Sequence, residues 1–126
     1  TLRGLHFQMK YPQSKLLRCL TGTIFDVAVD IRKDSPYFGK WVGEELSEEN
    51  KYQLYIPEGF AHGYYVMSEI AHTIYKCSDI YYPEYERGIR WDDPEIGIEW
   101  PATNPVLSNK DAAASCMGEM LFNNNS

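Results

Sequence analysis

The chain has 126 residues, of which 44% are hydrophobic, and this is enough for one domain with a single core. Twelve Lys and Arg against 18 Asp and Glu give a net charge of −6, which argues against a surface that binds the backbone of nucleic acid. The apolar stretches are far shorter than the ~20 residues of a membrane span. The sequence therefore predicts a soluble protein with neither nucleic acid nor membrane as partner.

Seven short runs rich in β-branched and aromatic residues predict strands, because Gly, Pro, Asp and Asn separate them. In chain order the predicted strands are 2–8, 15–20, 23–31, 39–46, 52–56, 63–67 and 72–78. Helix is expected only at 47–50, as one turn, and at 111–120, where Asp111 would be the cap. The spacing is typical of an antiparallel β-sandwich or barrel.

The predicted strand 23–31 shows the clearest alternation of side chains. One of its faces is entirely apolar and is predicted to be core (Phe25, Val27, Val29 and Ile31). The other face carries Asp26 and Asp30. Periodicity leaves open whether this face looks at solvent or into a polar cavity.

Two short segments predict turns. Residues 21–23 would form a hairpin connection, with a positive φ at Gly22. Pro57 and Gly59 predict a tight turn that leads directly to His62, because Pro presets φ and Gly accepts a left-handed conformation.

The chain has three histidines, His6, His62 and His72, and each lies in or beside a predicted strand. Histidine suits proton transfer near neutral pH, although a hydrogen-bonded structural role is the plainer alternative. His6 shares its strand with Arg3 and Gly4, which a purely structural strand would not need. Arg3 and His6 differ in parity, so we predict a β-bulge at Gly4 that brings them to one face.

The spacing Pro57-x-Gly59-x-x-His62 looks like the second motif of the cupin superfamily of small β-barrels. A metal-binding cupin would also need an upstream His-x-His and a carboxylate. The chain contains no His-x-His, which disfavours a metal site.

Three further residues have plain structural interpretations. Tyr75 and Cys77 share one face of the predicted strand 72–78, where a core tyrosine and a buried, unreactive thiol are expected. Lys15 begins a strand, and solvated lysines are common there.

Six segments together resemble the dTDP-4-dehydrorhamnose 3,5-epimerase family. They are LRGLHFQ at 2–8, FDVAVDIR at 25–32, SPYFGKW at 35–41, IPEGFAHG at 56–63, YKC at 75–77 and GIRWDDP at 88–94. The resemblance runs from Thr1 to about Asp111, and the motifs follow the family's order.

The resemblance implies an all-β, cupin-type jelly roll that works as a homodimer without metal or other cofactor. It implies inversion of C3 and C5 of dTDP-4-dehydro-6-deoxy-D-glucose to give dTDP-4-dehydro-L-rhamnose, in the biosynthesis of dTDP-L-rhamnose for surface polysaccharides. The ketone at C4 acidifies the hydrogens on both flanking carbons. One base and one acid on opposite faces can therefore invert each centre through an enolate.

By the same resemblance, His6 is the base, Asp111 orients it, Tyr75 is the acid and Lys15 stabilises the enolate oxygen. The remaining family positions are implied to contact the substrate. Arg3 and Lys15 match positions facing the sugar oxygens and the diphosphate, and His62 matches another substrate contact. Glu86 and Lys110 match nucleotide contacts. Tyr81 would stack on thymine or guard the sugar pocket, and Asp26 would face the cavity and pair with Lys15.

The expected domain covers residues 1–115, and residues 116–126 are expected to be a disordered tail. Thr1 is not a methionine and enters a strand at once, so we expect upstream sequence, including the family's N-terminal strands, to be absent from this chain. The cysteines, Cys19, Cys77 and Cys116, form no CxxC pair, which favours a reducing cytoplasm.

Four alternatives remain at this point. A related enzyme could invert only C3 or only C5, or could move the ketone along the ring. Outside this class stand a metal-dependent cupin oxygenase and a non-catalytic nucleotide-sugar binding module.

Overall fold

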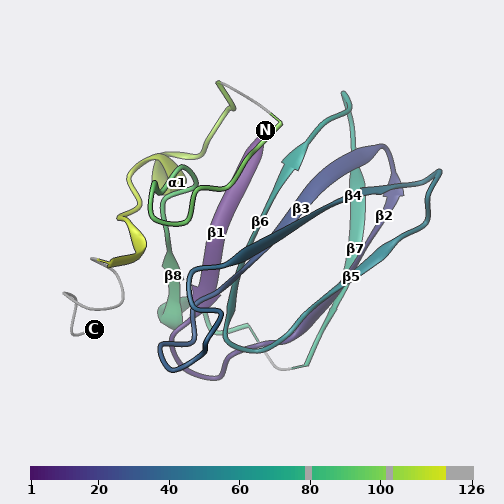
Figure 1. Ribbon diagram of the computed structural model, residues 1–126. Coiled ribbons are helices and arrows are strands. Elements are labelled where there is room, and N and C mark those ends of the chain that lie inside the picture. Colours follow the sequence, from purple (N-terminus) through teal and green to yellow (C-terminus); the bar gives the residue numbers. More distant parts are fainter. Residues whose placement is uncertain (79–80, 102–103, 119–126) are drawn as a thin grey trace.

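The computed structural model describes residues 1–78, 81–101 and 104–118, which form two facing antiparallel sheets (Figure 1). The five-stranded sheet has the order β4-β3-β6-β1-β8, and the three-stranded sheet has the order β5-β2-β7. The elements are β1 Leu2–Gln8, β2 Lys15–Thr21, β3 Thr23–Asp30, β4 Trp41–Ser47, β5 Gln53–Ile56, β6 Phe60–Val66, β7 His72–Cys77, η1 Pro83–Tyr85, β8 Glu86–Gly88 and α1 Asn109–Ala112. The predicted all-β class is confirmed.

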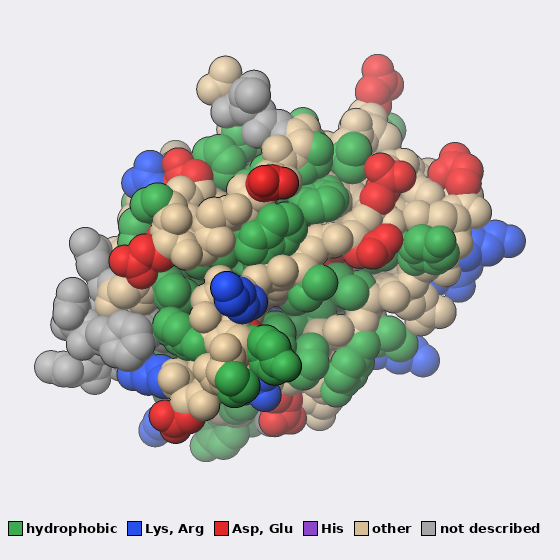
Figure 2. Space-filling model, in the orientation of Figure 1, with side chains coloured by type: hydrophobic (Ala, Val, Ile, Leu, Met, Phe, Trp, Pro, Cys, Tyr) green, Lys and Arg blue, Asp and Glu red, His purple; other side chains and the backbone are tan. Residues whose placement is uncertain are grey.

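The helices within these ranges are all too short to cross a membrane. On the face seen in Figure 2, hydrophobic side chains gather in the middle, and charged side chains lie mostly around them.

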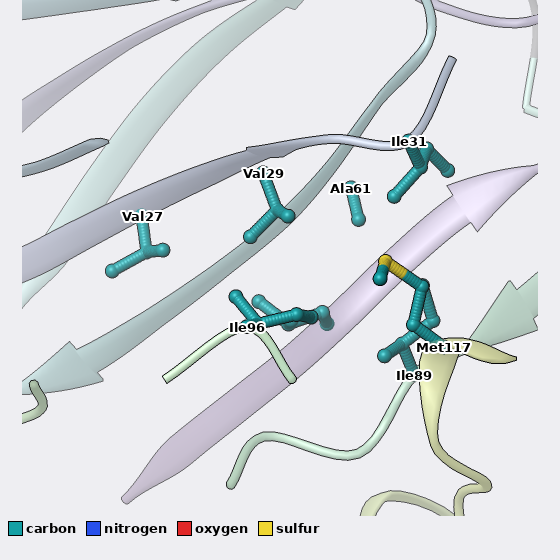
Figure 3. Packing of buried hydrophobic residues seen from close by; sticks show 8 residues of the cluster. Val27, Val29, Ile31, Ala61, Ile89, Ile96 and Met117 are labelled. Carbon is teal, nitrogen blue, oxygen red and sulfur yellow. The ribbon is translucent and has the colours of Figure 1, made fainter. Parts of the chain in front are cut away.

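The five-stranded sheet is buried on both faces. Towards the three-stranded sheet, Ile24 and Ala28 of β3 pack in one cluster with Leu17 of β2. On the opposite face, Val27 and Val29 of the same strand lie in a second cluster (Figure 3). The chain after β8 covers this second face and contributes Ile89, Ile96 and Met117 to the cluster. The predicted core face of β3 is therefore confirmed, and its other face is buried too.

The predicted hairpin at 21–23 is wrong. β2 pairs with β5 and β7, whereas β3 pairs with β4 and β6, so these residues carry the chain from one sheet to the other. Gly22 has the expected positive φ of 83°, and a Cβ there would lie 2.2 Å from the Ile70 carbonyl oxygen. A hairpin and a crossing between two sheets both use a short connection that contains glycine. The sequence of residues 21–23 therefore does not distinguish the two.

The helical predictions also need correction. Residues 48–50 form a turn, in which Ser47 and Asn50 exchange backbone-to-side-chain hydrogen bonds. Helix α1 begins earlier than predicted, because the Ser108 side chain accepts from the backbone N–H of Asp111 and so caps the helix. Asp111 lies inside α1, and its carboxylate is free for another contact.

The domain continues past the predicted boundary at residue 115. Met117 is only 4% exposed and belongs to the second core cluster. Its backbone N–H donates to the buried carboxylate of Asp93 over 2.6 Å. The predicted disordered tail, 116–126, therefore begins too early, and its residues 119–126 lie outside the described part of the chain.

A buried carboxylate fastens the loop after β3. Asp30 is 1% exposed and accepts from the Arg32 guanidinium at 2.8 and 3.0 Å and from the Ser35 hydroxyl at 2.6 Å. Hydrogen bonding by Arg32 lowers the pKa of Asp30 to about 2 against the opposing effect of burial. The aliphatic part of Arg32 in turn packs on Gly59, where a Cβ would lie 2.6 Å from Cγ. Asp30 thus supports the predicted turn at 57–59, whose Gly59 has a φ of 86°.

We predict that Asp30→Asn lowers the free energy of unfolding by about 1–2 kcal/mol at neutral pH, since Arg32 is half exposed and solvent screens the pair. The folded-state pKa lies below the ordinary 3.8, so this stability is complete above that pH and is lost as pH falls towards about 2. Denaturant titrations of both proteins at several pH values measure the difference.

The matched control for that prediction is Asp34→Asn, an exposed carboxylate of the same loop. It should leave stability nearly unchanged. Equal losses in both variants, or a loss in Asp30→Asn that does not shrink in acid, would contradict the assignment.

Candidate active site

A cavity of about 430 Å³ opens between the two sheets. Six residues predicted for the site line it: His6, Lys15, His62, Tyr75, Tyr81 and Glu86. Asp26, Lys110 and Asp111 contact these lining residues from behind. Nine of the ten predicted residues therefore line the cavity or contact its lining, and Arg3 is the exception.

The β-bulge at Gly4 is present, as predicted. The pairing of β1 with β6 shifts register between Arg3, opposite Tyr64, and His6, opposite His62. Directly opposed residues share a face of the sheet, so Arg3 and His6 lie on one side. Arg3 is nevertheless exposed and does not line the cavity.

The pairing of the strands builds one wall of the cavity. His6 is the Cα partner of His62 on one side and of Gly88 on the other. Glu86 is two residues before Gly88 and so points to the same face as His6. The result is a row of His62, His6 and Glu86 across β6, β1 and β8.

His6 is held by a carboxylate from the far end of the chain. Its Nε2 lies 2.6 Å from Oδ1 of Asp111, which is 3% exposed. The other oxygen, Oδ2, accepts from the backbone N–H of Gly4 over 3.2 Å. Because a carboxylate only accepts, Nε2 carries the hydrogen in this contact, and in the neutral form of the ring the lone pair is on Nδ1.

A second histidine and carboxylate lie beside the first pair. His62 Nε2 is 2.5 Å from Oδ1 of Asp26, which is fully buried. Oδ2 of Asp26 has no hydrogen-bond partner among the described residues. The expected ion pair of Asp26 with Lys15 is wrong, because Asp26 lies diagonally next to His62 in the five-stranded sheet while Lys15 is in the other sheet.

Glu86 connects three predicted residues. It accepts from the Tyr81 hydroxyl and, over 2.9 Å, from Lys110 Nζ. Burial acts to raise the pKa of Glu86, but the hydrogen bonds from Tyr81 and Lys110 and the charge on His6 outweigh it, so this pKa is lowered. The hydrogen bond to Glu86 also raises the pKa of Tyr81.

The three-stranded sheet supplies the opposite wall. Lys15 is opposite Cys77 and Leu17 is opposite Tyr75, so Lys15, Tyr75 and Cys77 point to one face. Tyr75 is 58% exposed although it lines the cavity. The prediction that Cys77 is buried is wrong, since Cys77 is an exposed residue of the cavity lining.

Gln8 also lines the cavity, although it was not among the residues predicted for the site. It donates to the Tyr11 carbonyl and accepts from the Tyr82 backbone N–H, both over 2.7 Å. It therefore ties the chain after β1 to the segment that carries Tyr81. The signal was available, because Gln8 follows His6 by two residues and shares its face.

The residues described by the structure include no group of three His, Cys, Asp or Glu side chains that could hold a metal ion. Within this part of the chain, the pairs His6–Asp111 and His62–Asp26 therefore do not combine into one metal-binding group.

Comparison with known proteins identifies the family to which this chain belongs. The family profile for dTDP-4-dehydrorhamnose 3,5-epimerase matches residues 1–119. The enzyme of that name from Shigella flexneri is 61% identical over 111 residues, which are 87% of this chain and 61% of that protein. The chain thus spans about three fifths of that relative's length.

Two crystal structures show the same jelly roll. The Legionella pneumophila dTDP-6-deoxy-D-glucose-3,5-epimerase, in complex with dTDP-4-keto-L-rhamnose, is 55% identical with a TM-score of 0.90, over 93% of this chain and 63% of that one. ChmJ, a 3'-monoepimerase of Streptomyces bikiniensis in complex with dTDP-quinovose, is 33% identical with a TM-score of 0.88, over 96% of this chain and 63% of that one. With a family profile that covers nearly all of it, and with relatives that share its sheets, the chain belongs to the dTDP-4-dehydrorhamnose 3,5-epimerase family.

Proposed function

We propose that this chain carries the catalytic centre of an epimerase that inverts C3 and C5 of dTDP-4-dehydro-6-deoxy-D-glucose. The observation that carries the proposal is the position of two proton-transfer groups on opposite walls of one cavity. His6, paired with Asp111, lies on the five-stranded sheet, and Tyr75 lies on the three-stranded sheet. Inversion of a carbon needs a base on one face and an acid on the other.

In this proposal, His6 Nδ1 removes the proton from the carbon next to the ketone. The electron pair of the C–H bond moves into the ring to form an enolate, whose negative oxygen Lys15 stabilises. Asp111 holds Nε2–H and so fixes the ring orientation in which Nδ1 is the base. Tyr75 then donates its phenolic proton to the same carbon from the opposite face.

We propose that the other predicted residues bind the substrate. Lys15 is a cation within the cavity, while Arg3 is exposed beyond it and would meet the diphosphate outside. His62, held by Asp26, would contact the sugar. Glu86, Lys110 and Tyr81 form one hydrogen-bonded group that would meet the nucleotide.

Inversion of a single centre is the second candidate function. It is favoured by the likeness to ChmJ, which is a 3'-monoepimerase and matches 96% of this chain. Double and single inversion would use the same two walls of the cavity. The number of sugar carbons that exchange their hydrogen with solvent distinguishes the two activities.

We predict that the C3 and C5 proton signals of dTDP-4-dehydro-6-deoxyglucose disappear when the sugar nucleotide is incubated with the chain in deuterated water. The reason is that each inverted carbon receives its new hydrogen from solvent. His6→Ala should slow this exchange by ~10²–10⁴-fold, which is the usual contribution of a general base. Proton NMR follows both signals in one experiment.

The control for His6→Ala is His72→Ala, because His72 is exposed and its neighbours Thr73 and Tyr75 point to the opposite face. It should exchange both positions at the parent rate. Loss of only one signal would assign a single-centre epimerase, and no exchange by the parent chain would refute catalysis by this chain.

We predict that Tyr75→Phe separates exchange from inversion. Without the phenol, the enolate can recover a hydrogen only from the His6 side, so deuterium should enter with retained configuration. Product should form at least ~10²-fold more slowly. Proton NMR coupling constants distinguish the retained from the inverted sugar.

The control for Tyr75→Phe is Tyr55→Phe, a tyrosine of the same sheet that is 60% exposed and opposite Leu16 on the outer face. It should behave as the parent. Inverted product from Tyr75→Phe at the parent rate would remove Tyr75 from the mechanism.

We also propose that the chain acts in the cytoplasm as a homodimer. In the described part of the chain, Cys19, Cys77 and Cys116 form no disulfide, which agrees with a reducing compartment. The outer face of the three-stranded sheet exposes Tyr55 and Ile74, at 60% and 50%, and could be covered by a second copy.

We predict that light scattering after gel filtration gives twice the mass of one chain, and that Ile74→Glu shifts it towards the monomer. Glu69→Lys, which changes an exposed charge in the loop before β7, is the control. A parent chain with the mass of one copy would contradict the dimer.

A further inference from the structure

His6 faces a second carboxylate besides Asp111. Glu86 Oε1 lies 3.7 Å from His6 Nδ1, the ring nitrogen that Asp111 leaves unused. The distance is too long for a hydrogen bond, but two charges so close interact strongly. The Glu86 side chain is 13% exposed, so solvent screens this interaction only in part.

Both oxygens of Glu86 are occupied by other partners. Lys110 donates to Oε1, and Tyr81 donates to Oε2. These contacts keep the carboxylate from closing on Nδ1, where it would block the lone pair. They also favour the ionised form, in agreement with the lowered pKa of Glu86.

The charged and titratable groups around His6 come from several elements. On the side of His6 they are Asp111 and Lys110 of α1, Glu86 of β8, Tyr81 of the segment before η1, and His62 of the neighbouring strand β6. On the opposite wall of the cavity they are Lys15, Tyr75 and Cys77. Among the described residues, two carboxylates, those of Asp111 and Glu86, lie within 4 Å of the His6 ring nitrogens, and Lys110 is the cation bound to Glu86. A positive charge on His6 is therefore favoured by two negative groups and opposed by Lys110.

We propose that Glu86 is a positioning residue for the base: its fixed negative charge stabilises His6 in the protonated form that exists after Nδ1 has taken the substrate proton. Lys110 and Tyr81 hold the carboxylate in place, and Lys110 limits its effect. This inference rests on the proposed function of His6. If the inference is correct, Glu86 favours the protonated form of His6 and Lys110 opposes it. Two residues that only contacted the nucleotide would not have these opposite effects.

The charges balance through this step. The C–H proton passes to Nδ1, so neutral His6 becomes a cation, and the C–H electron pair remains with the sugar as the enolate. Glu86 stays ionised and Asp111 keeps its hydrogen bond to Nε2–H. The new positive charge thus forms between two carboxylates, 2.6 and 3.7 Å from the ring nitrogens.

The test uses the ring ¹⁵N signals of the full chain, which report how much of each histidine is protonated at a fixed, mildly acidic pH. The chain has three histidines, so His6→Gln and His62→Gln variants assign all the signals. Glu86→Gln should lower the ratio of protonated to neutral His6 roughly threefold to tenfold. Lys110→Met should raise that ratio, because it removes the opposing cation.

Two controls accompany these variants. Glu84→Gln removes an exposed carboxylate of η1 that does not line the cavity, and it should leave the His6 signals unchanged. The exposed His72 serves as a reference within each sample. Unchanged His6 signals in Glu86→Gln, or shifts of the same sign in Glu86→Gln and Lys110→Met, would overturn the proposal.

The kinetic readout is the rate of deuterium entry into the sugar nucleotide at saturating substrate. Glu86→Gln should lower this rate roughly threefold to tenfold in addition to any change in KM, whereas loss of a substrate contact alone would change KM. The NMR measurement needs no substrate. A parent chain that fails to exchange the sugar would therefore refute the proposed function, while the His6 signals would still decide the role of Glu86.

Discussion

The carboxylate of Asp111 joins the two ends of the described chain. Oδ2 accepts from Gly4 and Oδ1 contacts His6, across 107 and 105 residues of sequence. The bulge at Gly4 turns His6 to the inner face, and α1 brings Asp111 to meet it. One buried side chain thus holds β1 and leaves Nδ1 of His6, the base of the proposed mechanism, without a bond to Asp111. The position of the C-terminal segment and the proposed chemistry depend on the same contact.

The covered outer face of the five-stranded sheet explains how this contact is maintained. Ile89, Ile96 and Met117 bury apolar surface against β3, and Asp93 fixes the segment through the Met117 backbone N–H. Burial of each large aliphatic side chain contributes about 1.5–3 kcal/mol. The segment that carries Asp111 is therefore anchored on both sides by packing, rather than by the His6 contact alone.

Local patterns predicted the strands well, since all seven predicted strands are present, with ends displaced by up to three residues. They failed where the answer depended on which sheet a strand joins, as at Gly22. Three-residue β8 was missed because so short a strand has no measurable alternation. The pairing of Asp26 with His62 was missed because it follows from the register of β3 with β6, which one strand cannot reveal. The roles of His6, Asp111 and Tyr75 came from the family resemblance, while their proximity came from the fold.

The contact between Gly4 and Asp111 also has a consequence for local opening of the fold. A segment that is docked on the remainder of a fold can open locally, at a lower free energy than global unfolding. Each opening of the C-terminal segment removes the carboxylate from His6 and exposes the Gly4 N–H at the same moment. The free energy of this opening therefore sets how often His6 lacks its carboxylate, and hydrogen-exchange protection of the Gly4 amide measures it.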